Sequence, residues 1–319
     1  MKRIVIAALS LAAAATTVAA PKAYVGNQEI GTISIIDTGS DTVIKTVPEK
    51  GKIGEKIQAV VTDPAEKNAF VVDAKGNSLV VVDLASGEIK QTIAVGQSPE
   101  GASLSPDGKT IAVCVEDDNV VTFVDVASQK VTKKIKTQGQ NPEHCVFTPD
   151  QKWLITANEN SNDIDVIDLA AGKSIAKIPT SGHPRGVALV PGKKIAYVVQ
   201  ETTNGVDVVD LVAKKVTTSI PTGTRPADVI ASKDGKRMFV ANGGEGTVSV
   251  IDVATNKVIG TAKVGKRSWN MGMTPDGSKL YTADGRSNAV SVIDTASLKT
   301  MKSIPVGGLP WGVFIRTPK

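Results

Sequence analysis

Short apolar runs that end in aspartate recur along the chain at a nearly constant interval. They read IID, VVD, FVD, VID, VVD, VID and VID, and successive aspartates lie 46, 42, 43, 42, 42 and 42 residues apart. The aspartates are Asp37, Asp83, Asp125, Asp168, Asp210, Asp252 and Asp294. A fixed period of this length is the signature of a repeat architecture, so we expect seven copies of one structural unit.

Each unit contains four short segments with strand-like composition. In the unit that begins at Gly101 these are GASLS, TIAVCV, VVTFV and KVTKKI. Their alternation and β-branched content favour strands, and the intervening PDG, EDDN and DVASQ segments are rich in turn formers, with the aspartates expected to cap the turns. Four strands at a period near 42 residues are typical of a propeller blade. The fold class predicted is all-β, a seven-bladed β-propeller.

The two ends of the chain predict how the ring closes. The first strands, 22–25, 32–36 and 43–47, correspond to the second, third and fourth strands of a unit. The last segment, 312–316, corresponds to a first strand without followers. We therefore expect one blade to be assembled from both ends, which leaves no free strand edge at the seam. Residues 20–319 would then form a single propeller domain.

Residues 1–19 have the features of a secretory signal peptide. Lys2 and Arg3 precede a short apolar stretch, and small residues follow it. This is the arrangement of a cleaved leader, and the apolar stretch is shorter than the roughly 20 residues of a membrane span. We expect cleavage after Ala19, because cleavage after Ala20 would place Pro21 next to the cut bond. The chain is thus expected to be periplasmic or secreted, without a membrane span after cleavage; an uncleaved anchor is the alternative.

Composition and charge narrow the class of partner. Apolar residues make up 41% of the chain, which excludes disorder, and aromatic residues only 3%, so Val and Ile must fill the core. Loss of Lys2 and Arg3 lowers the net charge from +5 to +3, and no basic run remains. Nucleic acid is therefore not expected as a partner. We expect a monomer.

The two cysteines, Cys114 and Cys145, lack the spacing of a metal site. We expect both to be free thiols. A disulfide is the alternative, since an oxidising compartment would permit one.

A candidate binding site follows from the segments that precede each first strand, most of which contain an x-P-x-G step. The residue after Pro, or its equivalent, is Ile57, Glu100, Glu143, Arg185, Ala227, Trp269 and Trp311. Because ring order follows chain order, these seven residues should rim the central funnel. The rim is asymmetric, with two glutamates and an arginine in sequence and two neighbouring tryptophans on the other side.

Indole surfaces beside arginines suit a small planar anionic ligand, which would stack on a tryptophan and pair with Arg185 or Arg225. The alternative is that the tryptophans cover an apolar axis and the charges are solvated. The predicted ligand-binding residues are Glu100, Glu143, His144, His183, Arg185, Arg225, Asp228, Trp269, Asn270 and Trp311.

The chain's only histidines, His144 and His183, fall in the same loops. Together with Glu100 and Glu143 they would suit a divalent metal, as in a lactonase- or lyase-like enzyme. A single histidine would also suit an axial haem ligand, although the absence of CxxCH excludes covalent haem. No nucleophile motif is present, so no catalytic residue is assigned. Histidines in solvated loops are the simpler interpretation.

Several segments resemble a known family. AYVGN (23–27), FVANG (239–243), TVSVIDVATNKVIG (247–260) and AVSVIDTASLKTMKSIPVGGLPWG (289–312) are similar to the YVTN-repeat, YncE-like propellers. ETTN (201–204), residues 269–294 and LPWG (309–312) resemble the subgroup of PQQ-dependent catabolism-associated β-propeller proteins. The unit at 48–67 departs from the pattern, because it lacks the x-P-x-G step and has about four extra residues.

The resemblance implies a periplasmic protein that assists a quinoprotein or redox system, with pyrroloquinoline quinone (PQQ) as the first ligand to test. The function expected is therefore non-catalytic binding of a ligand or a protein partner. A metal-dependent lactonase- or lyase-like enzyme and a tetrapyrrole carrier or assembly factor are the alternatives. Neither PQQ nor a divalent metal is required by the fold.

Overall fold

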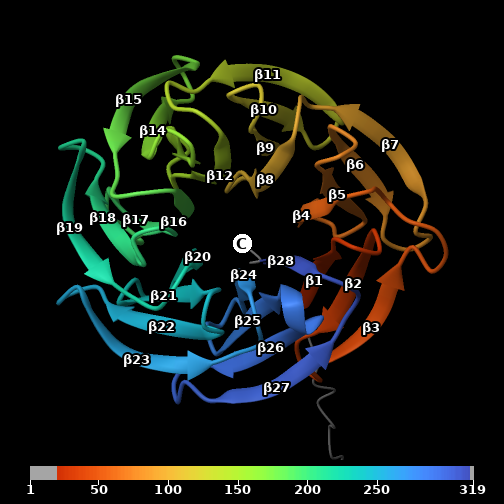
Figure 1. The fold of residues 1–319 in the computed structure, drawn as a ribbon. Coiled ribbons are helices and arrows are strands. Elements are labelled where there is room, and N and C mark those ends of the chain that lie inside the picture. The colour runs from red at the N-terminus through yellow and green to blue at the C-terminus, as the bar shows by residue number, and fades with distance from the viewer. Residues whose placement is uncertain (1–19, 317–319) are drawn as a thin grey trace, which may run out of the picture.

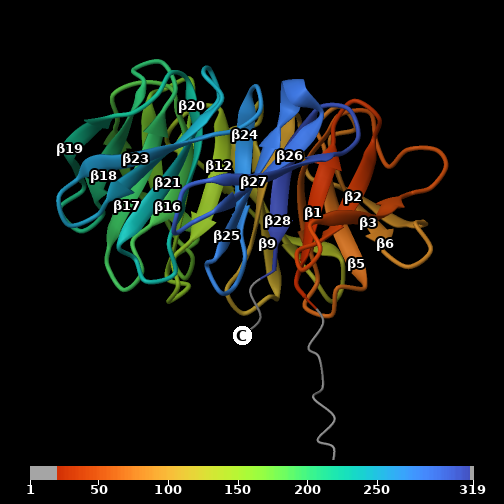
Figure 2. The same cartoon turned by 90° about the horizontal axis from the view of Figure 1, so that it is seen from below.

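The computed structural model describes residues 20–316, and the predicted leader, residues 1–19, lies outside this range. The described residues form seven four-stranded antiparallel sheets arranged as blades around a central axis (Figure 1). Seen edge-on, the blades form one ring with loops on two opposite faces (Figure 2). The predicted all-β, seven-bladed propeller is confirmed.

In each blade the strands follow one another from the axis outward. The inner strands are β4 (Ile57–Thr62), β8 (Pro99–Leu104), β12 (Pro142–Phe147), β16 (Pro184–Leu189), β20 (Pro226–Ala231), β24 (Ser268–Met273) and β28 (Pro310–Ile315). The second strands are β1 (Lys22–Asn27), β5 (Asn68–Asp73), β9 (Thr110–Val115), β13 (Trp153–Asn158), β17 (Ile195–Gln200), β21 (Arg237–Asn242) and β25 (Lys279–Asp284).

The third strands are β2 (Thr32–Asp37), β6 (Ser78–Asp83), β10 (Val120–Asp125), β14 (Asp163–Asp168), β18 (Gly205–Asp210), β22 (Thr247–Asp252) and β26 (Ala289–Asp294). The outer strands are β3 (Thr42–Val47), β7 (Ile89–Ala94), β11 (Lys130–Lys136), β15 (Lys173–Pro179), β19 (Lys215–Pro221), β23 (Lys257–Lys263) and β27 (Thr300–Pro305). A 3-10 turn, η1 (Gly285–Ser287), follows β25.

The blades are numbered I to VII in ring order. Blades I to VI begin with β4, β8, β12, β16, β20 and β24, and blade VII is made of β28, β1, β2 and β3. In blade VII the C-terminal strand pairs antiparallel with the N-terminal one, with Val25 opposite Val313 and Ala23 opposite Ile315. The predicted closure of the ring is therefore confirmed.

The repeated aspartates end the third strands by capping the turns that follow. Asp125 accepts hydrogen bonds from the Ser128 backbone N–H at 2.7 Å and from its hydroxyl, and Asp252 binds Thr255 in the same way. Gln129 and Asn256 then adopt positive φ angles of 56° and 55°, which close the turn. The aspartates thus have the turn-capping role predicted for them.

Adjacent blades pack face to face through aliphatic side chains. Between blades VII and I, for example, Ile33 and Ile35 lie in one cluster with Val71 and Val80. Cores of this kind are built mainly from valine and isoleucine, as the low aromatic content predicts. Within residues 20–316, no helix has the length and apolar character needed to cross a membrane.

The two cysteines lie on neighbouring blades and are free thiols in the structure. Cys114 on β9 is fully buried, and Cys145 on β12 is partly buried, with its thiol 3.7 Å from the Ala112 carbonyl oxygen. Burial, followed by hydrogen bonding with Cys145, raises the pKa of Cys114 well above its usual value.

Candidate functional site

Each inner strand begins with a bulge that frees its second residue from the ladder. On β12, Pro142 pairs with Asn158 and His144 with Ala157, so Glu143 has no partner on β13. Equivalent register shifts occur at the start of the other six inner strands. Bulges re-aim side chains, and here they place one extra residue per blade at the end of the axis where the inner strands begin. We call this end the mouth.

The rim at the mouth differs from the predicted one in blade I. Ile57 pairs with Asp73, as Pro142 pairs with Asn158, so Ile57 occupies the proline position and Gln58 is the rim residue. Ile57 is fully buried in the core between blades. The assignment of Ile57 to the rim was therefore wrong by one residue, because this unit lacks the proline that marks the position elsewhere.

Four glutamates surround Arg185 at the mouth. Its guanidinium forms an ion pair with Glu143, and its Nη1 lies 3.1 Å from Glu201 Oε2 and 3.2 Å from Glu159 Oε1. Glu100 follows at 3.9 Å from Nη2. Only 12% of the Arg185 side chain is exposed. The positive charge of Arg185 is therefore more than matched by protein carboxylates before any ligand arrives.

The charge cluster extends to the neighbouring blades through Glu201. Its Oε1 lies 2.7 Å from Arg225 Nη2 and 3.1 Å from Arg267 Nη2. His183 Nε2 lies 3.3 Å from Glu159 and 3.7 Å from Glu201. The hydrogen bond with Glu159 raises the pKa of His183 against the opposing effect of partial burial. The predicted residues Glu100, Glu143, Arg185, Arg225 and His183 thus belong to one network across blades II to VI.

Two pairs of carboxyl groups, Glu100 with Glu116 and Glu143 with Glu159, shift each other's pKa within this cluster. Burial, followed by the charge of Glu100, raises the pKa of Glu116 to about 9. Burial also raises the pKa of Glu143. Burial acts to raise the pKa of Glu159 as well, but hydrogen bonds with Glu143 and His183 lower it to about 2. Carboxyl groups this close do not all ionise, so the cluster holds protons at neutral pH.

Sequence reasoning missed four members of the network, Glu116, Glu159, Glu201 and Arg267. Glu116, Glu159 and Glu201 each directly follow the second strand of their blade. The same position holds Gly243 and Gly285 in blades V and VI. Comparison of this position across the repeats would have found the acidic group, whereas EDDN, which contains Glu116, was interpreted only as a turn.

A stacked pair of rings spans the axis just inside the mouth. The rings of His144 on β12 and Trp311 on β28 are 5.7 Å apart and 17° from parallel. Their strands are separated around the ring by β4 and β8 on one side and by β16, β20 and β24 on the other. Burial, followed by the charge of Arg185, lowers the pKa of His144 to about 4, so its imidazole is neutral at physiological pH.

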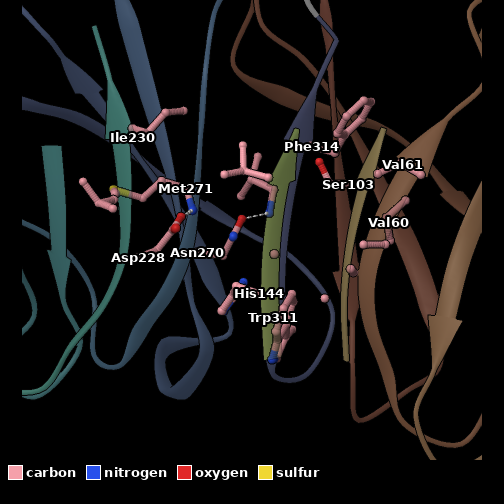
Figure 3. Close-up of a pocket in the computed structure, with 17 residues that line it drawn as sticks. Val60, Val61, Ser103, His144, Asp228, Ile230, Asn270, Met271, Trp311 and Phe314 are labelled. Atoms are coloured by element: carbon pink, nitrogen blue, oxygen red, sulfur yellow. Dashed lines mark hydrogen bonds between the residues drawn. The ribbon is translucent and has the colours of Figure 1, made fainter. Parts of the chain in front are cut away.

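A cavity of about 310 Å³ lies along the axis beside this pair (Figure 3). Four predicted site residues line it, His144, Asp228, Asn270 and Trp311. The remaining lining is mostly small or apolar, and includes Val60, Val61, Gly101, Ala102, Ser103, Val146, Val229, Ile230, Met271, Gly312, Val313 and Phe314. Glu100, Glu143, His183, Arg185, Arg225 and Trp269 are not part of this lining.

Glycine at the third position of the inner strands permits their close approach. A Cβ on Gly101 would lie 2.2 Å from the Glu143 carbonyl oxygen, and one on Gly186 would lie 2.6 Å from the Asp228 Cα. At Gly312 the nearest atom would be Asn270 Oδ1 at 3.5 Å, so this glycine leaves room in the cavity. The glycine of the x-P-x-G step therefore permits close packing around the axis in blades II and IV. In blade VII it leaves space for the cavity.

Trp269 lies over the backbone of Gly285 rather than in the cavity. A Cβ at Gly285 would come within 2.1 Å of its indole ring. The Arg267 guanidinium lies 5.9 Å from the ring centroid of Trp269. Of the two predicted stacking surfaces, only Trp311 lines the central cavity.

In the part of the chain that the structure describes, no three His, Cys, Asp or Glu side chains are grouped so as to hold a metal ion. His144 and His183 are the two histidines that were candidates for such a site. His144 stacks on Trp311 and its Nε2 lies 3.5 Å from Glu143 Oε1, whereas His183 lies beside Glu159 and Glu201 without a ring partner in the described residues. The two histidines therefore occupy different surroundings.

The fold is shared with proteins of known structure. Hydrazine synthase of Kuenenia stuttgartiensis is 23% identical, with a TM-score of 0.71 over 79% of this chain and 87% of that one. A functionally unknown protein of Desulfotomaculum acetoxidans is 14% identical, with a TM-score of 0.80 over 94% of this chain and 100% of that one. The dihydro-heme d1 dehydrogenase NirN, solved in complex with DHE, is 15% identical, with a TM-score of 0.68 over 96% and 77% of the two chains.

No curated protein matches the sequence. The sequence pattern of the YncE-like β-propeller family matches residues 59–317, which is most of the chain. The seven blades and the closure by β28 agree with that match. The chain therefore belongs to the YncE-like β-propellers.

Proposed function

We propose that this protein is a non-catalytic, periplasmic or secreted binding protein that holds one small, flat molecule in its central cavity. The observation that carries the proposal is the cavity of about 310 Å³ beside the stacked Trp311 and His144 rings. Small-molecule pockets have volumes of roughly 300–1,000 Å³, mostly apolar walls and a few polar groups. This cavity lies at the lower end of that range and suits a compound of two or three rings.

The polar groups of the cavity support binding over catalysis. Asp228 and Asn270 hold the backbone of neighbouring strands, and His144 is stacked and neutral. Side chains fixed in this way are suited to orient a ligand rather than to move during a reaction. Trp311 is 5% exposed and has His144 stacked on its ring, so a ligand would contact the part of the indole that lines the cavity.

Because the sequence resembles PQQ-associated propellers, the proposal includes an accessory role in a quinoprotein system. PQQ is therefore one compound to test. PQQ is flat and anionic, like the class of ligand that was expected from the sequence. Arg185, the residue expected to bind an anion, already faces four carboxylates. The charge at the mouth therefore supports binding of an anionic ligand less than the sequence alone did.

A tetrapyrrole carrier is the second candidate, and it is favoured by one comparison. NirN, whose title names dihydro-heme d1, shares this fold and was solved in complex with DHE. A tetrapyrrole is wider than this cavity and would lie at the mouth, where 30% of the His183 side chain is exposed. A protein partner that covers the mouth and a metal-dependent lactonase- or lyase-like reaction are the remaining alternatives.

Native mass spectrometry of the protein isolated from its host tests the proposal, with Gly312→Leu as a variant that fills the cavity. A side chain at this position meets no atom closer than 3.5 Å at its Cβ, so the variant should fold and melt close to the wild type. We expect a non-protein mass on the wild type that is absent from Gly312→Leu. An absorption spectrum of the same sample identifies a tetrapyrrole. A wild-type mass equal to that of the chain, both as isolated and after incubation with host extract, contradicts the proposal.

A further inference from the structure

The third residue of the inner strands is polar in only three blades. His144 pairs with Ala157, Asp228 with Ala241 and Asn270 with Ala283, so the three side chains occupy the same register position on β12, β20 and β24. The other four blades have alanine or glycine there, at Ala59, Gly101, Gly186 and Gly312. Asp228 is the only acid in this set.

Asp228 and Asn270 each accept a hydrogen bond from a backbone N–H of the next inner strand (Figure 3). Asp228 Oδ2 accepts a hydrogen bond at 2.9 Å from the N–H of Met271 on the next inner strand. Asn270 Oδ1 accepts one at 3.1 Å from the N–H of Val313, again on the next inner strand. Because an amide oxygen is sufficient for this bond on β24, the bond does not account for a carboxyl group on β20.

The surroundings of Asp228 are unfavourable for a negative charge. The residue is 8% exposed, and Val229, Ile230 and Met271 share the wall of the cavity with it. Burial raises its pKa to about 7, although hydrogen bonds from the Met271 and Val229 N–H groups and the charge of Arg185 act in the opposite direction. A buried carboxylate without a partner of opposite charge is costly.

The protein offers Asp228 no ion-pair partner within residues 20–316. Arg185 is the one cation whose charge reaches it, and that arginine is paired with glutamates. His144, the other ionisable side chain on the cavity, is neutral because its pKa is about 4. The cavity thus presents an unneutralised acid, walls of mixed polar and apolar character, and part of one largely buried indole.

We infer that Asp228 is the counter-ion for a positively charged group of the ligand, so that the cavity takes a flat compound carrying a protonated amine or a similar cation. This inference rests on the proposed function and specifies the class of ligand. The indole of Trp311 would add a cation–π contact to the charged hydrogen bond with Asp228. The sign of the charge is opposite to that expected from the sequence, which considered Arg185 without its glutamates.

Three indoles of similar shape and different charge test the inference by calorimetry at pH 8: tryptamine, 3-ethylindole and indole-3-propionic acid. Each is titrated into the wild type, Asp228→Asn and Glu245→Gln. Asp228→Asn keeps the acceptor for the Met271 N–H and removes only the charge. Glu245→Gln removes one charge from an exposed loop of the same blade, where the two carboxylate oxygens accept hydrogen bonds from the Thr224 N–H and the Thr247 hydroxyl. The amide oxygen of Gln can keep one of these two hydrogen bonds.

We expect tryptamine to bind the wild type at least about tenfold more tightly than the other two compounds, the factor of one charged hydrogen bond. Asp228→Asn should abolish this preference and leave the affinity for 3-ethylindole unchanged, whereas Glu245→Gln should keep the preference. If all three compounds bind equally, or if Asp228→Asn keeps the preference, the inference is overturned and the proposed function stands. If none binds the wild type at millimolar concentration, the inference is overturned, and the bound mass measured on the isolated protein decides the proposed function separately.

Discussion

At the scale of single residues, Arg185 determines the charge of the mouth. One guanidinium serves Glu100, Glu143, Glu159 and Glu201, and all five side chains are largely buried. Such groups are stable only as a set, because removal of one partner leaves uncompensated charge in a poorly solvated place. The network therefore joins blades II, III and IV at the mouth as well as setting the local charge.

Replacement of Arg185 by methionine should lower the free energy of unfolding by about 3–5 kcal/mol at pH 8, because the glutamates lose their counter-ion. The loss should be smaller at pH 4, where these carboxyl groups can take up protons. Urea unfolding at the two pH values measures both effects.

Arg225→Ala is the matched control for that experiment. Its side chain is 59% exposed and also pairs with Glu201, so its loss should cost less than about 1 kcal/mol. Equal losses for the two arginines would contradict the assignment of Arg185 as the centre of the network.

The pKa values of the two histidines should be shifted in opposite directions from the ordinary value of 6.5. His144 is buried, and its pKa of about 4 means that it binds fewer protons in the folded chain than in the unfolded one. Its contribution to stability is therefore complete above pH 6.5 and is lost as the pH falls toward 4. The pKa of His183 is raised, so its contribution is complete below pH 6.5 and is lost as the pH rises through the folded value.

Side-chain NMR spectra of the histidines across pH 3 to 9 measure this difference directly, and His144→Gln assigns the signals. A titration of His144 near pH 6.5 would show that its ring is not enclosed beside Trp311.

At the scale of elements, most of the fold could be predicted because each blade repeats the same local signals. Alternating β-branched residues and capped turns specify the strands, and the incomplete units at the two ends specify the seam. The error at Ile57 arose where the local marker was missing. The charge cluster could not be found from one loop at a time, because Glu116, Glu159 and Glu201 acquire their role only when blades II to IV meet.

Deletion of residues 310–319 should open the ring, because β1 loses the hydrogen bonds that it makes to β28. Blade VII would expose a strand edge, and blades VI and I would lose the contacts they make with β28. We expect a large fall in Tm or aggregation, measured by calorimetry and light scattering. A synthetic peptide of residues 310–319 added in trans should restore part of the Tm. A truncated protein that melts like the full chain would contradict the closure.

At the scale of the whole molecule, the ring brings together side chains that no single blade contains. Trp311 near the C-terminus stacks on His144, and Asp228 and Asn270 line the same cavity from two further blades. The sequence indicated that these four residues face the funnel, since ring order follows chain order. It did not indicate which of the ten candidates line the cavity, because this depends on how side chains from opposite blades meet at the axis.

The central claim, that the cavity beside Trp311 binds a small flat molecule, is tested most directly by the indole N–H signals of the three tryptophans. A set of two- and three-ring compounds of positive, neutral and negative charge is titrated into ¹⁵N-labelled protein, with single Trp→Phe variants to assign the signals. We predict that at least one compound shifts the Trp311 signal in a saturable manner. The signal of Trp153, which lies under Lys194 at the start of β13 rather than on the cavity, should not move. A Trp311 signal that no compound shifts, or that shifts only together with Trp153, would contradict the account.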